Sequence, residues 1–231
     1  MKLIGLLGGM SWESTALYYK MINETVKSER GGLHSARILL HSVNFHEIAA
    51  CQHDGDWAGA GRLLVAAAQS LRAGGADFLV IATNTMHKLA LEIETAGNLP
   101  LLHIVDPTAE ALRADGHRRV ALLGTRFTME EDFYRRRLTD RFGLEVFVPD
   151  QTGRETIHRI IYEELCRGTV NPASAELFRD VITTLKASGA QALILGCTEL
   201  TMIIDSDTSA LPLYDTTLLH ATRAARFAME T

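Results

Sequence analysis

The stretch ALILGCTEL, residues 192–200, is an apolar run that stops at Gly196 and is followed directly by Cys197. A second stretch, FLVIATNTM at residues 78–86, has the same form and carries Thr83 where the first carries Cys197. Short apolar runs that end in glycine or polar residues are typical of strands buried in a parallel sheet. We therefore expect each stretch to be a buried strand with a reactive or polar side chain just beyond its carboxyl end.

Short apolar runs alternate with amphipathic stretches along the chain. The runs are continuously apolar, as expected where helices cover both faces of a sheet. The alternation of strand and helix predicts an α/β fold with doubly wound parallel sheets. The expected strands are Leu3–Leu7, Arg37–His41, Phe78–Ala82, Leu99–Ile104, Arg119–Leu123, Glu145–Val148, Ala192–Leu195 and Pro212–Tyr214. The expected helices include Trp12–Ser28, Asp56–Ala73, Met129–Phe142, Glu155–Arg167, Pro172–Lys186 and Thr216–Met229.

The chain also repeats itself at about half its length. Residues 71–85 (LRAGGADFLVIATNT) align with residues 185–199 (LKASGAQALILGCTE), and in this alignment Thr83 falls on Cys197. The stretches LLGGMSWESTALYY and LLGTRFTMEEDFYR align at nearly the same offset. Two matches at nearly equal offsets favour a duplicated α/β unit over chance similarity.

A duplicated unit of this kind predicts two pseudo-symmetric doubly wound parallel-sheet lobes with the active site in the cleft between them. Ligands of open parallel sheets bind beyond the carboxyl ends of the strands. We expect a first lobe at residues 1–108 and a second lobe at residues 109–209. The C-terminal segment, residues 210–231, is expected to pack back on the first lobe.

Composition excludes several classes of partner. The chain has 231 residues and a formal net charge of −5, with no basic stripe, which argues against nucleic acid and against an anionic membrane. The N-terminal apolar run breaks at Gly8 and is too short for a signal segment or a membrane span. We expect neither a membrane nor a nucleic-acid partner.

The cysteine and histidine patterns predict a cytoplasmic protein without a metal. Cys51, Cys166 and Cys197 are far apart and form no CxxC pair, so free thiols in a reducing compartment are expected. No histidine spacing fits a metal site. The glycines at Gly5, Gly8 and Gly9 do not form GxGxxG, so no dinucleotide cofactor is expected.

The polar residues at the expected strand ends favour acid–base chemistry on a small anionic ligand. Each of these loops runs into an expected helix start, where free backbone N–H groups suit a carboxylate. Cys197 and Thr83 would approach such a ligand from opposite sides. Moving a proton from one face of a carbon to the other needs a base on one side and an acid on the other. A thiol with an ordinary pKa of about 8.5 suits this work, and a helix N-terminus can lower that pKa.

Four motifs, GLLGGMSWEST, ATNTMHK, LLGTRFTM and GCTEL, resemble in order and spacing the aspartate/glutamate racemase family. The resemblance spans nearly the whole chain. It implies a cofactor-independent enzyme, specifically an amino-acid racemase (an isomerase), with two α/β lobes, an amino acid as its small-molecule substrate, and a homodimer as the usual assembly. It implies that Thr83 and Cys197 are catalytic and act on opposite faces of the substrate Cα. The substrate contacts implied are Met10, Ser11, Gln52, Thr83, Asn84, Thr85, Thr125, Glu164 and Thr198.

Two departures from the family pattern bear on substrate and direction. Thr83 stands where the family has its first cysteine, so we expect Cys197 to abstract the proton from an L-amino acid and Thr83, or a linked water, to reprotonate the other face. Glu163 and Glu164 stand where aspartate-specific members have a lysine. Carboxylates there disfavour a dianionic substrate, so a broader amino-acid range stands beside L-aspartate and L-glutamate.

Two other functions stay open on the sequence alone. Retention of one thiol also fits an enzyme that resembles arylmalonate decarboxylase, which protonates one face of an enediolate. A non-catalytic regulatory protein that binds an amino acid is the third reading. The sequence favours a helix-surface or supporting position for His87 over a general base, and it leaves open whether Arg126 is a charge in the pocket.

Overall fold

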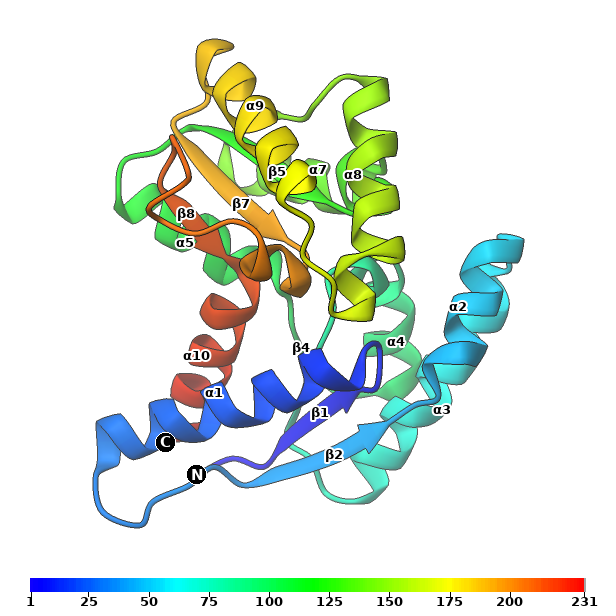
Figure 1. The fold of residues 1–231 in the computed structure, drawn as a ribbon. Helices are drawn as coiled ribbons and strands as arrows, with labels where there is room; N and C mark the ends of the chain where they lie inside the picture. The colour runs from blue at the N-terminus through cyan, green and yellow to red at the C-terminus, as the bar shows by residue number, and fades with distance from the viewer. Residues whose placement is uncertain (231) are drawn as a thin grey trace. The chain divides into compact units, whose positions relative to one another are not determined.

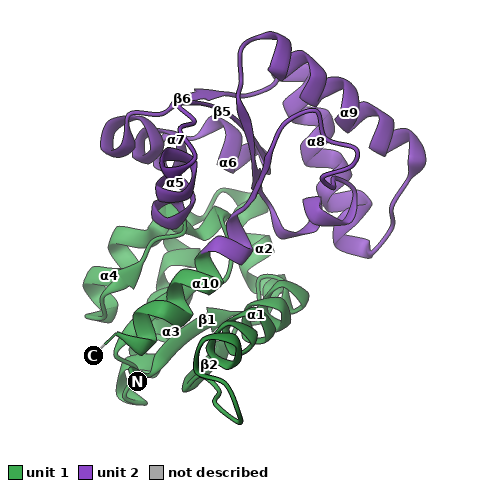
Figure 2. Cartoon of the chain, turned by 90° about the vertical axis from the view of Figure 1, so that its left-hand side faces the viewer, with its two compact units in different colours: residues 1–104, 220–231 green, residues 105–219 purple. Residues whose placement is uncertain are grey.

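The structure is a computed structural model in which residues 1–230 are described. The described chain divides into two compact units (Figure 2). The first comprises residues 1–104 with residues 220–230, and the second comprises residues 105–219. The boundary therefore falls four residues before the expected one. Of the segment expected to join the first lobe, only the part from His220 onward does so, because Leu213–Asp215 pairs within the second sheet.

The first unit holds a four-stranded sheet with the order β2-β1-β3-β4, in which every described pair of neighbours is parallel (Figure 1). Its strands are β1 (Ile4–Gly8), β2 (Ile38–Ser42), β3 (Phe78–Ile81) and β4 (Leu101–Leu102). Its helices are α1 (Trp12–Arg30), α2 (Phe45–Asp54), α3 (Trp57–Ala73), the 3₁₀ helix η1 (Thr85–Leu89) and α4 (Ala90–Gly97).

The second unit holds a four-stranded sheet with the order β6-β5-β7-β8, again parallel at every described pair. Its strands are β5 (Arg119–Gly124), β6 (Glu145–Phe147), β7 (Ala192–Gly196) and β8 (Leu213–Asp215). Its helices are α5 (Val105–Ala114), α6 (Arg126–Glu130), α7 (Asp132–Arg136), η2 (Arg137–Arg141), α8 (Gln151–Glu163), η3 (Leu165–Arg167), α9 (Pro172–Ala187) and η4 (Thr198–Met202). Helix α10 (Thr216–Met229) begins in this unit and ends in the first.

The two sheets have the same strand order when the numbering is shifted by four. The stretches 78–86 and 192–200 thus form β3 and β7 with the loops that follow them, which occupy the same place in their respective sheets. Tyr18 and Tyr134, which the repeat aligns, are both fully buried. The predicted fold class, two doubly wound parallel α/β sheets, is confirmed.

The continuous apolar runs follow from burial of both sheet faces. In the first unit, Leu6 and Val80 pack with residues of α1 and α10, whereas Leu7 and Ile81 pack with residues of α3 and α4. Adjacent side chains of a strand point to opposite faces, so a strand covered on both sides must be apolar at every position. In the second unit, the strand residue Leu193 packs with α8 and α9. Within residues 1–230, no helix is long and apolar enough to cross a membrane.

Candidate functional site

Parallel strands present their carboxyl ends at one edge of a sheet, so each unit gathers its polar loops at one edge. In the first unit these loops follow β1, β2 and β3, and in the second they follow β5 and β7. Most of the residues implied as substrate contacts lie in these loops. Thr85 and Thr198 are the first residues of η1 and η4, Gln52 lies on α2, and Glu164 follows α8 directly.

The loop after β1 is clamped by one threonine of the first turn of α1. The hydroxyl of Thr15 donates to the carbonyl of Ser11 at 2.8 Å and accepts from the N–H of Gly9 at 2.8 Å. The side chain of Ser11 caps the helix by accepting from the N–H of Ser14. Gly9 has φ +93°, and a Cβ there would lie 2.3 Å from the carbonyl oxygen of Val43. The backbone of this loop is therefore fixed in shape before any ligand arrives.

Two of the implied contacts in the first unit differ in character. Met10 is 5% exposed and packs in the apolar core with Leu7 and Ile48. Gln52 is 9% exposed, and its side-chain oxygen has no hydrogen-bond partner within residues 1–230. A buried acceptor without a partner costs free energy, typically about 1–3 kcal/mol, unless a ligand satisfies it. Gln52 is thus suited to accept a hydrogen bond from a bound cation.

Thr83 lies between β3 and η1, outside regular secondary structure. It is half-buried, whereas Asn84 is 4% exposed and Thr85 is 6% exposed. The backbone carbonyl of Thr83 is held by the imidazole of His87 at 2.8 Å. This local arrangement leaves the Thr83 side chain as the most accessible of the three polar positions.

In the second unit, Thr125 lies between β5 and α6, and Thr198 is the first residue of η4, which follows β7. Thr125 is 6% exposed and caps the short helix α6, where its hydroxyl accepts from the N–H of Thr128. The hydroxyl of Thr198, which is half-buried, accepts from Thr217 at 3.4 Å. Both hydroxyls are held by neighbours in their own unit.

Arg126 is exposed, and its backbone N–H donates to Nδ1 of His158 at 3.3 Å. The pKa of His158 is lowered, chiefly by burial and further by the charge of Arg126. The imidazole of His158 is therefore uncharged at neutral pH.

The thiol of Cys197 donates to the carboxylate of Glu199 at 2.9 Å. The pKa of Cys197 is raised above its ordinary value by burial first, then by the negative charge of Glu199 and the hydrogen bond to its side chain; the backbone N–H of Glu199 acts in the opposite direction. The helix that follows Cys197, η4, is one short 3₁₀ turn and carries a carboxylate two residues after the thiol.

Glu164 lies just beyond α8 and is already engaged within its unit. Its carboxylate accepts from the hydroxyl of Ser174 at 2.7 Å and lies 3.8 Å from the guanidinium of Arg159. Its side chain is 17% exposed, whereas the side chain of Glu163 is 59% exposed. Glu164 is the sheltered carboxylate of the pair, and Glu163 is a surface charge.

Comparison with known proteins identifies the family of the chain. A model of the Asp/Glu/Hydantoin racemase family matches residues 7–224. The chain belongs to this family. The crystal structure of a Yersinia pestis protein regarded as an Asp/Glu racemase matches with a TM-score of 0.94 and 53% sequence identity over 100% of both chains.

Two curated relatives of this racemase family support the assignment. The broad-specificity amino-acid racemase RacX of Bacillus subtilis is 24% identical over 225 residues, 92% of each protein. A glutamate racemase of Koribacter versatilis is 29% identical over 144 residues, which make up 62% of this chain and 48% of that protein; the match thus spans about half the length of that relative. The predicted family and the predicted class, an isomerase of the amino-acid racemase type, are confirmed.

Sequence reasoning gave no role to several residues that shape the racemase-family loops. Glu199 stands inside the GCTEL motif, and its spacing of two from Cys197 could have indicated a side-chain contact. Tyr162 lies close enough to Cys197 that the thiolate charge contributes to raising the pKa of its phenol, after burial. Thr15 could not have been found, because its clamp depends on the fold of the Gly8-Gly9 turn. Cys166 is exposed.

Proposed function

We propose that this protein is a cofactor-independent amino-acid racemase that inverts the α-carbon by a two-base proton transfer. One observation carries the proposal: Cys197 and Thr83 follow the equivalent strands β7 and β3 of two sheets with the same order. A thiol and a hydroxyl at equivalent positions supply the two proton-carrying groups that inversion requires. The proposal assigns them to opposite faces of one substrate Cα.

The polar loops supply groups that match an amino acid. The substrate ammonium needs acceptors, and the buried oxygen of Gln52 is an acceptor without a partner within residues 1–230. The substrate carboxylate needs donors, which the hydroxyls and backbone N–H groups around Asn84, Thr125 and Thr198 can provide. Ser11 and Thr85 complete this set, and Met10 contributes an apolar wall.

The proposed reaction begins with Cys197 as thiolate. Its sulfur takes the Cα proton of an L-amino acid, which leaves a carbanion whose charge is shared with the substrate carboxylate. The hydroxyl of Thr83, or a water linked to it, donates a proton to the opposite face, and proton exchange with solvent restores both groups. Because the pKa of Cys197 is raised, only a small thiolate fraction exists at neutral pH, and turnover should increase with pH.

The proposed substrate range extends from L-aspartate and L-glutamate to amino acids with uncharged or cationic side chains. The carboxylate of Glu164 repels a second negative charge on a substrate that lies near it, whereas the charge of the exposed Glu163 is screened by solvent. Hydrogen bonding to Ser174 holds Glu164 in place, so its charge is fixed rather than mobile. Assays across single amino acids test this range.

The deciding experiment incubates the protein with single L-amino acids in heavy water without pyridoxal phosphate. We expect Cα deuteration together with formation of the D-enantiomer, both lost in Cys197→Ala. Tight binding of an amino acid with no exchange at Cα would instead establish a regulatory binding protein.

A second candidate function follows from the single thiol on these strand ends. An enzyme that resembles arylmalonate decarboxylase needs Cys197 alone, because it protonates only one face. Incubation with an α-aryl malonate separates the two functions. Release of CO₂ without racemisation of any amino acid would favour the decarboxylase.

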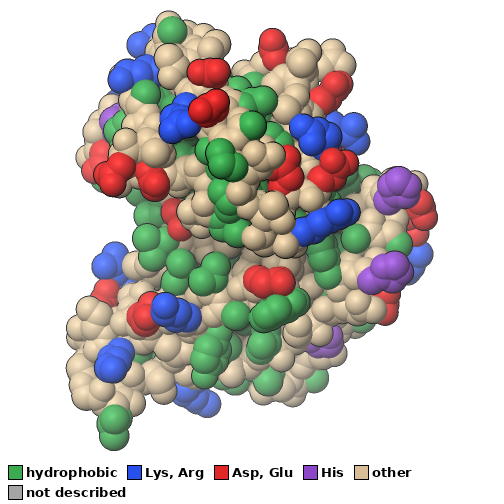
Figure 3. All heavy atoms as spheres, in the orientation of Figure 1, with side chains coloured by type: hydrophobic (Ala, Val, Ile, Leu, Met, Phe, Trp, Pro, Cys, Tyr) green, Lys and Arg blue, Asp and Glu red, His purple; other side chains and the backbone are tan. Residues whose placement is uncertain are grey.

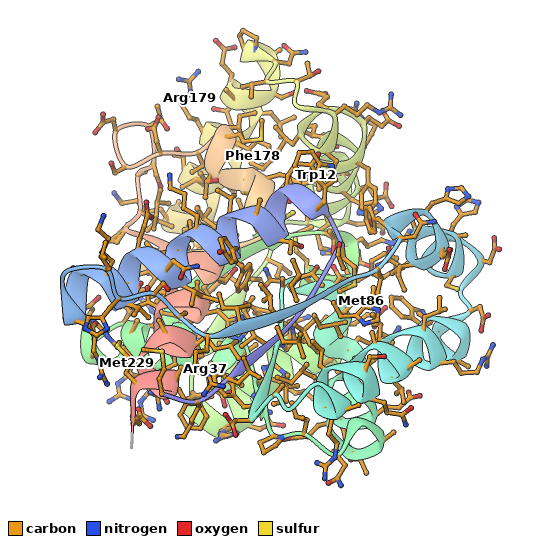
Figure 4. The ribbon with its side chains drawn as sticks, turned by 90° about the horizontal axis from the view of Figure 1, so that it is seen from below. Trp12, Arg37, Met86, Phe178, Arg179 and Met229 are labelled. Carbon is orange, nitrogen blue, oxygen red and sulfur yellow. The ribbon has the colours of Figure 1, made fainter. Side chains whose placement is uncertain are left out.

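We also propose that the chain is a cytoplasmic homodimer. Helix α1 exposes two large hydrophobic side chains on one face, Trp12 and Tyr19, with exposed fractions of 68% and 54%. Figure 3 shows hydrophobic side chains over the region where Figure 1 draws α1, and Trp12 lies at the start of that helix (Figure 4). Such a face is suited to an interface with a second copy. Sedimentation of wild type and of Tyr19→Glu tests it: a wild-type dimer and a weakened variant dimer are expected.

A further inference from the structure

Three buried histidines lie together in the first unit, behind the loop that carries Thr83. His87 is 2% exposed, His103 is 7% exposed and His220 is fully buried. The ring centroid of His87 lies 4.6 Å from that of His103 and 5.7 Å from that of His220. His87 is therefore not on a helix surface, and Met86 beside it is buried in the same unit (Figure 4).

Both ring nitrogens of His87 contact backbone groups, and these contacts fix its tautomer. The N–H of Ile104 donates to Nε2 at 3.2 Å, so Nε2 carries a lone pair rather than a proton. In a neutral imidazole the other nitrogen then carries the proton. Nδ1–H accordingly donates to the carbonyl of Thr83 at 2.8 Å.

This bond takes the place of a backbone hydrogen bond. In an α-helix the carbonyl of residue 83 would accept from the N–H of residue 87. Here the N–H of His87 donates to the backbone carbonyl of Asn84 at 3.1 Å, as in a 3₁₀ turn. The Thr83 carbonyl accepts instead from the imidazole of His87. One imidazole thus links the end of β3 to Ile104, just beyond the end of the neighbouring strand β4.

A second imidazole anchors the same part of β4. Nε2 of His220 contacts the carbonyl of Leu102 at 2.8 Å, and because a carbonyl only accepts, this nitrogen carries the proton. Nδ1 of His220 lies 2.8 Å from the hydroxyl of Tyr18, which is fully buried. The strand end that holds His87 is itself held by α10 and α1.

We propose that His87 is a positioning residue for Thr83: as the neutral Nδ1–H tautomer it fixes the backbone at residue 83 and so aims the Thr83 hydroxyl. The proposal rests on the catalytic role proposed for Thr83. Misplacement of a catalytic group by about 1 Å can cost about 100-fold in rate. His87 is not a general base, because Nε2 could take a proton only by giving up its buried bond to Ile104.

Two variants of His87 and one of Tyr18 distinguish the loss of the donor to the Thr83 carbonyl from a general loosening of the histidine cluster. His87→Asn places an amide N–H near the position of Nδ1 and keeps a donor for the Thr83 carbonyl. His87→Phe keeps the ring volume and removes the donor. Tyr18→Phe is the matched control, because it removes a buried hydrogen bond of the same cluster without touching the Thr83 carbonyl.

The decisive readout is the ratio of Cα exchange with retention to inversion, measured with an L-amino acid in heavy water. In the proposed mechanism, exchange with retention needs Cys197, whereas inversion also needs Thr83 to protonate the opposite face. We expect His87→Phe to lose at least tenfold in inversion while keeping most of the exchange, with His87→Asn restoring much of the inversion. Tyr18→Phe should lower thermal stability and leave the ratio unchanged. An unchanged ratio in His87→Phe would overturn the proposal.

Imidazole ¹⁵N spectra of the free protein provide a readout that does not depend on activity. We expect the His87 signals of a neutral ring with the proton on Nδ1 across the neutral pH range. A protonated Nε2 would overturn the assignment. The outcomes also separate this proposal from the proposed function. Wild type without any Cα exchange defeats the racemase, whereas an active wild type with an unchanged ratio in His87→Phe defeats only the positioning role.

Discussion

The thiol of Cys197 and the carboxylate of Glu199 share a hydrogen bond of 2.9 Å. A carboxylate beside a thiol disfavours the thiolate, and burial acts in the same direction. In the free protein the proton therefore stays on the sulfur of Cys197. A base that must first lose its own proton makes turnover depend on pH.

Replacement of Glu199 by glutamine should lower the pKa of Cys197. Removing the negative charge stabilises the thiolate, so the acid limb of the kcat/KM profile should move to lower pH. Alkylation of Cys197 by iodoacetamide at pH 7 should become faster. Glu176→Gln, which neutralises a carboxylate that is 75% exposed, is the control and should leave both measurements unchanged. Slower alkylation in Glu199→Gln would mean that the carboxylate activates the thiol.

Loss of the thiol should abolish chemistry at Cα. We expect Cys197→Ala to lower Cα exchange by about 10³-fold, within the range of about 10²–10⁴ that a positioned acid–base group supplies. Cys166→Ser removes an exposed thiol of the same unit and should retain activity. Exchange that persists in Cys197→Ala would move the base to another residue.

Introduction of a second thiol should make turnover more balanced. A threonine hydroxyl is a poor base, so abstraction of the proton from a D-amino acid should be the slow direction in wild type. Thr83→Cys should raise the rate from D to L by at least about tenfold, measured by chiral chromatography. No gain in that direction would count against the placement of Thr83 opposite Cys197.

Most of the architecture could be predicted because it follows from side-chain periodicity. The central strands β1, β3, β5 and β7 are buried at nearly every position and therefore stand out as continuous apolar runs. All eight expected strands overlap observed ones. Helices α2, α4 and α5 were not among the expected helices. Helix α2 ends at the left-handed Gly55 and begins at an Asn44 cap, which are signals that the sequence does contain.

The candidate site could be predicted residue by residue only where it belongs to a motif. Thr83 and Cys197 stand out because the repeat aligns them at strand ends. The spacing of Glu199 from Cys197 indicates a possible contact, but not its effect on the pKa of the thiol. The contact of His87 with the Thr83 carbonyl could not be derived, because only the folded chain creates it. Sequence spacing alone does not say whether such a neighbour is charged or neutral.

A positive charge at position 164 should shift substrate preference towards acidic amino acids. Glu164→Lys replaces the repelling charge with an attracting one, and the ratio of kcat/KM for L-aspartate over the isosteric L-asparagine should rise about tenfold, equivalent to about 1.4 kcal/mol. Glu163→Lys is the matched control, because that side chain is largely exposed and its charge is screened. Equal shifts in both variants would indicate a long-range field instead of a contact at Glu164.

Alanine at Gly9 should destabilise the loop after β1 more than alanine at another glycine with positive φ. Gly9 has φ +93°, and its Cβ would meet the Val43 carbonyl oxygen at 2.3 Å, so backbone strain and a steric clash act together. We expect the free energy of unfolding to fall by about 2–4 kcal/mol, measured by urea denaturation.

Gly31→Ala provides the control for backbone strain alone. Gly31 has φ +72°, but apart from its two chain neighbours no residue of the described chain has an atom within 4 Å of its Cβ position. Its replacement should cost about 1 kcal/mol, at the lower end of the strain range. Because Thr15 holds the Gly9 N–H and the Ser11 carbonyl at once, displacement of Gly9 should also weaken amino-acid binding, which Gly31→Ala should leave intact. Equal losses of stability in the two variants would show that the backbone at Val43 can move away from a Cβ at position 9 without a loss of folding free energy.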